Sequence, residues 1–293
     1  MQDTTVNIEN KEDNDSWDMV IEPKTRLLQL NLKEVWRYRD LMLLFVKRDF
    51  VAQFKQTILG PFWHLIQPVL TTIMFLFIFG RIARISTDGI QPTLFYMSGI
   101  TIWNYFSACL TNTSNTFTAN AGIFGKVYFP RLVLPFSVVI SNMVRLGIQF
   151  LLLFSMMVYY HFNGYPIHLT FYWLLLPLLV IMMAGTGLGL GIIISSLTTK
   201  YRDFAVLLTF AIQLGMYATP IAYPMSFLAN KSYAGLIRAN PLTSIVETFR
   251  YILFGNGSFN VAGLTYSAGF MIVVLFSGII IFNKVEKSFM DTV

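Results

Sequence analysis

The residue patterns that carry catalysis or nucleotide binding are missing from this sequence. It contains no G-x-x-x-x-G-K-[ST] loop, and the segment from Gly122 to Val127 lacks the glycine spacing and the final hydroxyl of such a loop. The three histidines have no metal-ligand spacing, and no Ser-His-Asp pattern stands out. The single cysteine, Cys109, fits a small buried apolar side chain. We therefore expect no cofactor or metal in this chain, and we expect that it is not an enzyme.

Acidic residues are absent from the long apolar stretches of the chain. Only 12% of all residues are charged, against about 25% in soluble proteins. Glu247 lies outside these stretches, and an ion pair with Arg250 at i and i+3 is its simplest role. Carriers driven by protons or sodium usually need carboxylates near the bilayer midplane. If the chain transports a cargo, a partner must therefore supply the energy.

One charged residue, Arg145, lies within an apolar stretch. A charge at the centre of a membrane helix costs at least about 2.5 kcal/mol, so it is a functional candidate. Two interpretations stay open. Arg145 faces a polar pore or binds a phosphate, or it pairs with a carbonyl or polar side chain between helices.

Two short segments, 123–131 and 199–203, are both basic and aromatic and connect apolar stretches. One interpretation is a pair of basic turns on the cytoplasmic side. The other is a docking surface for a cytoplasmic motor domain, because aromatic and arginine side chains are common anchors of protein interfaces. The candidate docking residues are Phe124, Lys126, Tyr128, Phe129, Arg131, Tyr201, Arg202 and Asp203.

The elements that must position these groups are predicted to be membrane-spanning helices. A bilayer core about 30 Å thick needs roughly 20 apolar helical residues, and 55% of this chain is hydrophobic. The six stretches that qualify cover residues 61–79, 93–110, 132–160, 171–197, 204–221 and 264–282. They do not alternate with the period of two that a membrane barrel requires. The predicted fold class is an all-α polytopic membrane protein with about six transmembrane helices.

Basic residues indicate the orientation of these helices. With six spans, 15 of the 21 Lys and Arg residues fall on the side of the two termini and five fall on the other. This bias places both termini in the cytoplasm. The basic residues lie between apolar runs rather than on one polar module, so we expect no nucleic-acid partner. Residues 1–22 are polar and acidic, without the apolar core of a signal peptide, and predict a loosely attached cytoplasmic tail.

Three further segments have distinct patterns. Residues 32–55 predict an amphipathic helix on the cytoplasmic leaflet, with Arg48 and Lys55 at the turn into the membrane. Residues 222–257 contain an apolar run that is too short to cross, and they predict a pair of short helices dipping into the outer leaflet. The fourth span contains alternating glycines from Gly185 to Gly191, which favour close packing of helices.

Short motifs recur in a specific order along the chain. They are Arg48-Asp49-Phe50, Leu59-Gly60-Pro61-Phe62-Trp63 with Gln67-Pro68, Lys126 to Leu132, Tyr201 to Phe204, Thr219-Pro220-Ile221 with Tyr223-Pro224, and Asn240-Pro241. In this order the chain resembles the permease subunit of a type-2 ABC transporter, in the branch that exports O-antigen, capsular or teichoic-acid polysaccharides. The resemblance covers about residues 25–290 and leaves out the acidic tail.

The resemblance implies a function and an assembly. The chain would form a homodimer with two copies of a separate cytoplasmic ABC ATPase, which binds the ATP and Mg. The dimer would lie among the lipids of a bacterial inner membrane and export a lipid-linked polysaccharide between its subunits. Residues 1–24 would be the tail, 25–60 an interface helix and gating turn, and 61–293 the transmembrane domain. Residues 119–131 would form the ATPase-coupling helix, and 222–257 an outer gate.

Site residues follow from this resemblance. Arg48 and Lys55 would meet the pyrophosphate of the lipid carrier at the cytoplasmic gate, as charged donors. Aromatic rings suit the walls of a sugar channel because they offer stacking faces, although each ring equally fits a lipid-facing belt. The expected channel-lining residues are Trp103, Tyr105, Phe106, Arg145, Tyr217 and Tyr223.

Two other functions stay open at this point. The same family fold would serve for a teichoic acid, a drug or a small lipid as cargo. A membrane-embedded acyl- or glycosyltransferase is a different class of protein, and it would need a buried acid, base or metal site. Spans without Asp or Glu argue against that class.

Overall fold

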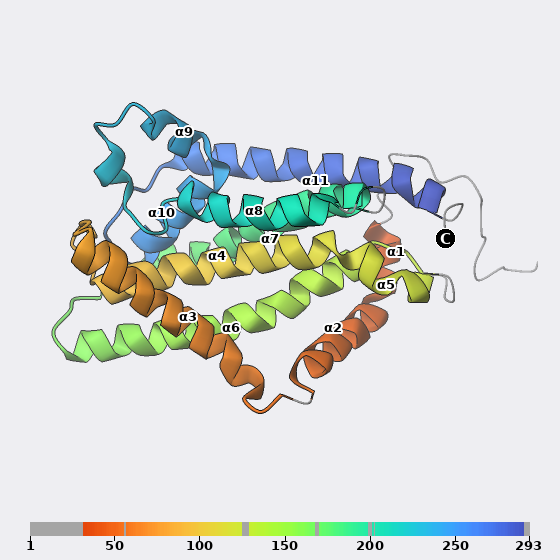
Figure 1. The fold of residues 1–293 in the computed structure, drawn as a ribbon, viewed down its shortest axis with the longest axis horizontal. Coiled ribbons are helices and arrows are strands. Elements are labelled where there is room, and N and C mark those ends of the chain that lie inside the picture. The colour runs from red at the N-terminus through yellow and green to blue at the C-terminus, as the bar shows by residue number, and fades with distance from the viewer. Residues whose placement is uncertain are drawn as a thin grey trace, which may run out of the picture.

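The computed structural model describes residues 32–289 except 56, 125–128, 168–169, 199–200 and 202, and this part contains helices and no strand (Figure 1). The acidic tail lies outside the described residues. A helix occupies each of the six predicted stretches. These are α3 (Trp63–Phe75) with the π-helical η2 (Leu76–Ile82), α4 (Pro92–Ser114), α6 (Val133–Phe162), η3 (Phe171–Leu175) with α7 (Leu176–Thr198), α8 (Asp203–Tyr217) and α11 (Val261–Phe289). The all-α polytopic fold class is confirmed.

Four segments of the described chain are long and apolar enough to cross a membrane, namely 63–82, 133–162, 171–198 and 261–284. Of the other two predicted spans, α4 is long enough with its 23 residues but carries many Ser, Thr and Asn side chains. The prediction that the fifth span reaches Ile221 is wrong, because α8 stops at Tyr217. The cause is Pro220, which disfavours a helical conformation of the preceding Thr219. The 15 residues of α8 span about 22 Å.

The outer surface of α3 has the character expected of a membrane helix. Only Pro68, Thr72 and Phe75, at i, i+4 and i+7, are buried along one stripe. Large apolar side chains cover much of the rest, and Leu70 and Ile73 are 57% and 55% exposed. Such a contiguous apolar surface is unfavourable in water. It fits a helix that faces lipid or a second subunit.

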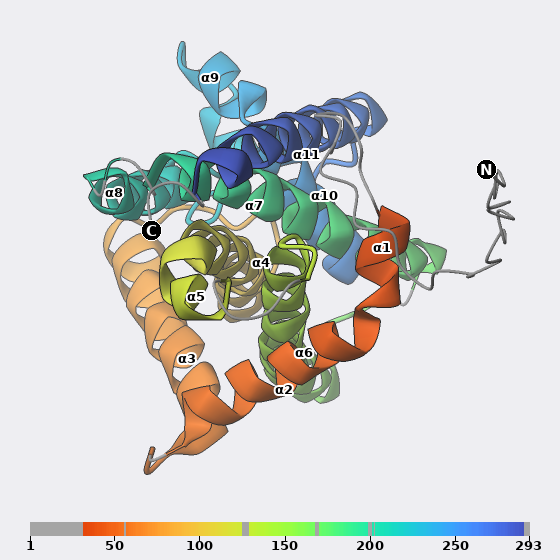
Figure 2. The same cartoon turned by 90° about the vertical axis from the view of Figure 1, so that its right-hand side faces the viewer.

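Helix α4 lies at the centre of the bundle (Figure 2) and packs against α3, α6, α7, α8 and α10. Of its 23 residues 16 are buried, which explains why a polar composition is tolerated at this place. Some of its polar side chains are hydrogen-bonded, within α4 or to a neighbouring helix. Asn112 donates to Asn142 of α6 at 3.1 Å, and Ser98 bonds the carbonyl of Phe95.

Helix α7 packs between α4 and α11, and its glycines permit this. A Cβ atom on Gly187 would lie 3.1 Å from the carbonyl oxygen of Phe106 in α4. A Cβ atom on Gly189 would lie 2.8 Å from the backbone nitrogen of Leu275 in α11. The two neighbours therefore approach α7 from different sides at backbone distance. The predicted close helix packing is confirmed.

Elements predicted on one side of the membrane gather at one end of the bundle. The first helices α1 (Leu32–Arg37) and α2 (Arg39–Phe54), helix α5 (Thr116–Phe124) and the C-terminal end of α11 lie at one end, on the right in Figure 1. Helices α9 (Ala234–Ala239) and α10 (Pro241–Phe254) lie at the opposite end. This grouping agrees with the alternation of six spans. Which end faces the cytoplasm stays a prediction.

The predicted interface helix is present in two pieces that break at Tyr38. Helix α2 ends at Phe54, one residue before the predicted end, and the short η1 (Gly60–Phe62) then leads into α3. Met42 and Phe45 of α2 are buried against the bundle. The face that α2 turns away from the bundle is also partly apolar, with Leu43 and Leu44 about 60% exposed. The element is therefore a helix with apolar groups on two faces.

Residues 222–257 form the predicted pair of short helices, after a single turn of η4 (Met225–Leu228). The Asn240-Pro241 motif starts α10, since the Asn240 side chain accepts a hydrogen bond from the backbone nitrogen of Leu242 at 3.0 Å. Pro241 stands at the first helical position, where it is favoured. Gly255 ends the helix in the left-handed conformation with φ +74°. Local sequence signals thus fix both ends of α10.

Candidate functional site

Arg48 on α2 connects this helix to α5. Its guanidinium lies 2.7 Å from the carboxylate of Asp49 and donates to the side-chain oxygen of Asn120 at 3.1 Å. It also lies 4.8 Å from the ring centre of Phe45. Lys55 is exposed one residue beyond α2. Both predicted gate residues thus stand near the turn into α3, and their binding of a pyrophosphate stays a prediction.

Arg145 contacts α2 through Gln53. Its guanidinium donates to the Gln53 side-chain oxygen at 2.6 Å, and the amide nitrogen of the same glutamine lies 3.0 Å from the His64 ring on α3. Gln53 therefore joins α6 to the start of the first span. This geometry favours the interpretation that Arg145 pairs with a polar side chain between helices. A role in lining the channel is left untested.

The predicted coupling helix, residues 119–131, includes the end of α5 up to Phe124, and its described remainder is the coupling loop at residues 129–131. Phe129 is buried, and its ring centre lies 5.7 Å from that of Phe45 on α2. Arg131 is 9% exposed. Lys126, Tyr128 and the side chain of Phe124 lie outside the described residues. The described part of the loop is therefore packed against α2, so a force on this loop reaches α2 directly.

The second predicted docking segment precedes α8. Tyr201 is 53% exposed, and its ring centre lies 6.3 Å from that of Phe204. Asp203 opens α8, where a carboxylate complements the partial positive charge of a helix N-terminus. Arg202 lies outside the described residues. Tyr201 thus offers an accessible ring at the same end of the bundle as α5.

The aromatic residues predicted to line a channel fall into two groups. Trp103, Tyr105 and Phe106 on α4 are buried at 4%, 3% and 4% exposure, inside the core of the chain itself. Tyr217 is 55% exposed at the end of α8, and the Tyr223 hydroxyl donates to its carbonyl at 2.7 Å. A single chain therefore presents only the second group on its surface. Their part in a channel stays a prediction.

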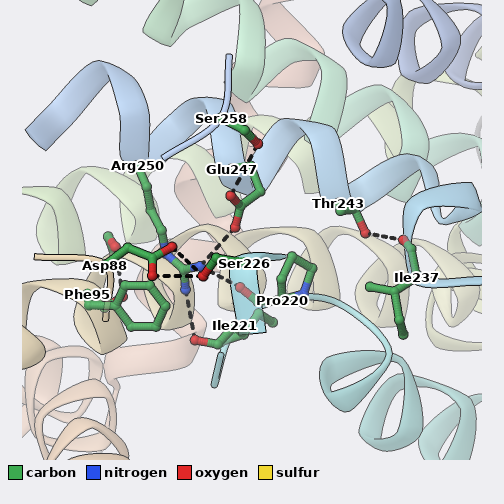
Figure 3. Close-up of polar contacts among 11 residues, drawn as sticks. Asp88, Phe95, Pro220, Ile221, Ser226, Ile237, Thr243, Glu247, Arg250 and Ser258 are labelled. Atoms are coloured by element: carbon green, nitrogen blue, oxygen red, sulfur yellow. Dashed lines mark hydrogen bonds and ion pairs between the residues drawn. The ribbon is translucent and has the colours of Figure 1, made fainter. Parts of the chain in front are cut away.

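The end of the bundle that is predicted to face outward holds a buried charged group, Arg250 on α10 (Figure 3). Its guanidinium donates to the carbonyls of Pro220 and Ile221 at 2.5 and 2.8 Å. It lies 3.5 Å from the carboxylate of Glu247, which confirms the predicted ion pair at i and i+3. The centre of the Phe95 ring is 3.7 Å away, in a cation–π arrangement. Arg250 thus ties α10 to α4 and to the turn after α8.

Two more polar contacts surround this cluster. The Ser226 hydroxyl lies 2.7 Å from both carboxylate oxygens of Asp88, which belongs to the loop between η2 and α4. The Ser258 hydroxyl donates to Glu247 at 3.4 Å. Sequence reasoning identified the Glu247–Arg250 pair but missed the carbonyl acceptors. An arginine in a largely apolar helix next to Pro-rich turns was the available signal.

The fold described above is that of a polytopic helical membrane protein, and its sequence identifies the family. Residues 40–254, which include most of the described helices, match the ABC-2 type transporter family. The chain belongs to this family.

Named relatives extend the match over nearly the whole chain. An O-antigen export system permease protein RfbA of Klebsiella pneumoniae is 30% identical over 255 residues, which are 86% of this chain and 94% of the relative. The RfbA of Myxococcus xanthus is 24% identical over 265 residues, or 89% and 98% of the two chains. The polysialic acid transport protein KpsM of Escherichia coli is 22% identical over 253 residues, or 84% and 93%.

Proposed function

We propose that this chain is the membrane permease subunit of an ATP-driven exporter that moves a lipid-linked polysaccharide of the O-antigen type across the bacterial inner membrane. The observation that carries this proposal is the similarity, over nearly full length, to relatives named as O-antigen export permeases. The relative named for polysialic acid transport is less similar and also carries a polysaccharide name. A hydroxyl-rich polymer is therefore preferred over a drug or a small lipid as cargo.

The energy for export comes from a separate ABC ATPase in this proposal. The sequence has no P-loop, and the six predicted spans have no Asp or Glu for ion coupling. Two ATPase subunits bind ATP and Mg and dock on the end of the bundle that carries α5 and Tyr201. The permease acts as a homodimer with both termini in the cytoplasm. The contact of Phe129 with Phe45 supports transmission of force from the coupling loop to α2.

A co-purification experiment tests the proposal. The tagged chain is expressed in its native bacterium and purified from membranes together with any ABC ATPase that binds it. We expect the ATPase to be retained and to hydrolyse ATP. Replacing Tyr201 with Ala is expected to weaken retention by about fivefold or more, as for truncation of an aromatic interface anchor.

Tyr233→Ala is the matched control, because Tyr233 is 50% exposed at the opposite end. It should retain the ATPase like the parent chain. If no ATPase is retained, or if a strain without this chain still places its polysaccharide on the cell surface, the proposal is wrong.

A further inference from the structure

The turn that follows α8, residues 218–223, is attached to the rest of the chain by two polar side chains. Arg250 bonds the carbonyls of Pro220 and Ile221. Asn240 bonds the carbonyl of Ala218 and the hydroxyl of Thr219, both at 3.0 Å. Side-chain hydrogen bonds of this kind are exchangeable, because another donor can take the place of either group.

Helix α4 is shaped to admit the guanidinium of Arg250. A Cβ atom on Gly99 would lie 2.6 Å from an Arg250 nitrogen and 3.3 Å from the Ile221 carbonyl oxygen. Phe95, one turn earlier on α4, presents its ring face to the same guanidinium. Arg250 is 1% exposed, so this arrangement leaves it no contact with water. The outer end of α4 thus forms a seat for the arginine and for the turn that it holds.

A structural role alone does not require a charged group at this place. Apolar side chains of similar volume often stabilise a buried site as well as an ion pair does. The chain instead has the ion pair of Arg250 with Glu247. Asp88, which accepts a hydrogen bond from Ser226, lies nearby (Figure 3). Four segments therefore meet at one polar cluster, namely α10, the loop with Asp88, η4 with Ser226 and the turn 218–223. A charged cluster is suited to contacts that form and break, because its groups can be satisfied by a polar cargo.

We propose that Arg250 and Asn240 form a clasp that holds the outer turn closed and that a passing polysaccharide opens. This inference rests on the proposed export function and adds a chemical condition for the cargo. A sugar hydroxyl both donates and accepts, so hydroxyls can bond the released guanidinium and also the freed carbonyls of Pro220 and Ile221. An apolar lipid tail can replace neither bond. The clasp thus favours hydroxyl-rich cargo at the exit.

Cysteine labelling measures the clasp without cargo or ATPase. In a Cys109→Ala background, Ala222→Cys places one thiol on the turn, where the native side chain is 2% exposed. Membrane vesicles that expose the outer face are treated with a membrane-impermeant maleimide. We expect slow labelling when Arg250 is present. Arg250→Gln removes the charged donors and is expected to raise the labelling rate about tenfold or more.

Other variants keep the test decisive. Gly99→Ala displaces the guanidinium without removing it. Arg250→Lys keeps the charge but has one donor nitrogen in place of the two that reach the Pro220 and Ile221 carbonyls. Both variants should therefore also raise the labelling rate. If Arg250→Gln does not reach the membrane, the labelling rate of either of these two variants still tests the clasp. Arg238→Gln removes an exposed arginine of α9 and should leave labelling unchanged. Parental labelling in all of the Arg250 and Gly99 variants that reach the membrane overturns the clasp.

The export proposal fails by a different observation, which is normal surface polysaccharide in a strain that lacks the chain. The labelling result stays interpretable in that case, because it reports only the turn.

Discussion

At the end of the bundle predicted to face outward, Arg250 is enclosed and bonded to two carbonyls and an ion-pair partner. At the opposite end, Arg48 and Gln53 on α2 make partly exposed contacts to Asn120, Arg145 and His64. The outer contacts join segments of one chain tightly. The inner contacts leave α2 attached by few polar bonds, beside a coupling loop. The difference is consistent with the proposed function, in which a closed exit lies at one end and a partner acts on the other.

Removing the outer charge should give the largest loss of stability. Arg250→Met leaves Glu247 buried without its partner, and a broken buried pair costs about 3–5 kcal/mol. We expect a clear fall in the thermal unfolding temperature of the purified protein. The double variant Arg250→Met with Glu247→Met should recover part of this loss, because no charge is then left unpaired. Equal unfolding temperatures of the single and double variants would contradict the claim that Arg250 compensates the buried charge of Glu247.

The second largest loss of stability is expected when a side chain is added at Gly99, beside the guanidinium of Arg250. Gly99→Ala adds a methyl group 2.6 Å from the guanidinium and should cost about 1–3 kcal/mol through overpacking. Gly147→Ala on α6 is the matched control, since a Cβ atom there meets nothing within 4 Å. That control should be neutral or slightly stabilising in the same melting experiment. A melting temperature of the Gly99 variant equal to that of the control would show that the seat is not tight.

At the inner end, Gln53→Leu removes the contacts to both Arg145 and His64. Arg145 then loses the acceptor of a charge-assisted bond, so we expect a loss of about 1.5–3 kcal/mol, lessened by the water that reaches this half-buried group. The stability change should therefore be smaller than for Arg250→Met. A loss as large as that of Arg250→Met would show that the entrance is as rigid as the exit.

The smallest effect is expected for Asn120→Ala, which removes the acceptor of Arg48 on α5. Arg48 keeps the Asp49 carboxylate, and both side chains are about a third exposed. Exposed ion pairs and their neighbours contribute about 0–1 kcal/mol. The unfolding temperature should change little. A larger fall than for Gln53→Leu would contradict the expectation that the Gln53 contacts stabilise the chain more than the Asn120 contact.

Sequence patterns predicted the elements better than the contacts between them. Apolar length located the helices, and the glycines of α7 indicated close packing. Asn240 and Gly255 carry local signals for the ends of α10 that were not used in the prediction. The end of α8 was missed, although the later Pro220 carries the signal. These features are local, so a single sequence can show them.

The site could be predicted only in part, because its contacts are distant along the chain. Arg145 meets Gln53 across 92 positions, and Arg250 meets the Pro220 carbonyl across 30. The Glu247–Arg250 pair was predictable since it follows helical spacing. Polar and apolar residues are mixed around α4. The sequence therefore does not indicate which of its side chains, Trp103 among them, are buried against other helices.

The central claim is that this chain exports only when a separate ATPase drives it. Purified chain is reconstituted into lipid vesicles with a fluorescent lipid-linked polysaccharide, with or without its ABC ATPase, and transfer across the membrane is followed by enzymatic trimming of the exposed polymer. We expect transfer only when the ATPase and ATP are both present. Equal transfer by the chain alone would contradict the account.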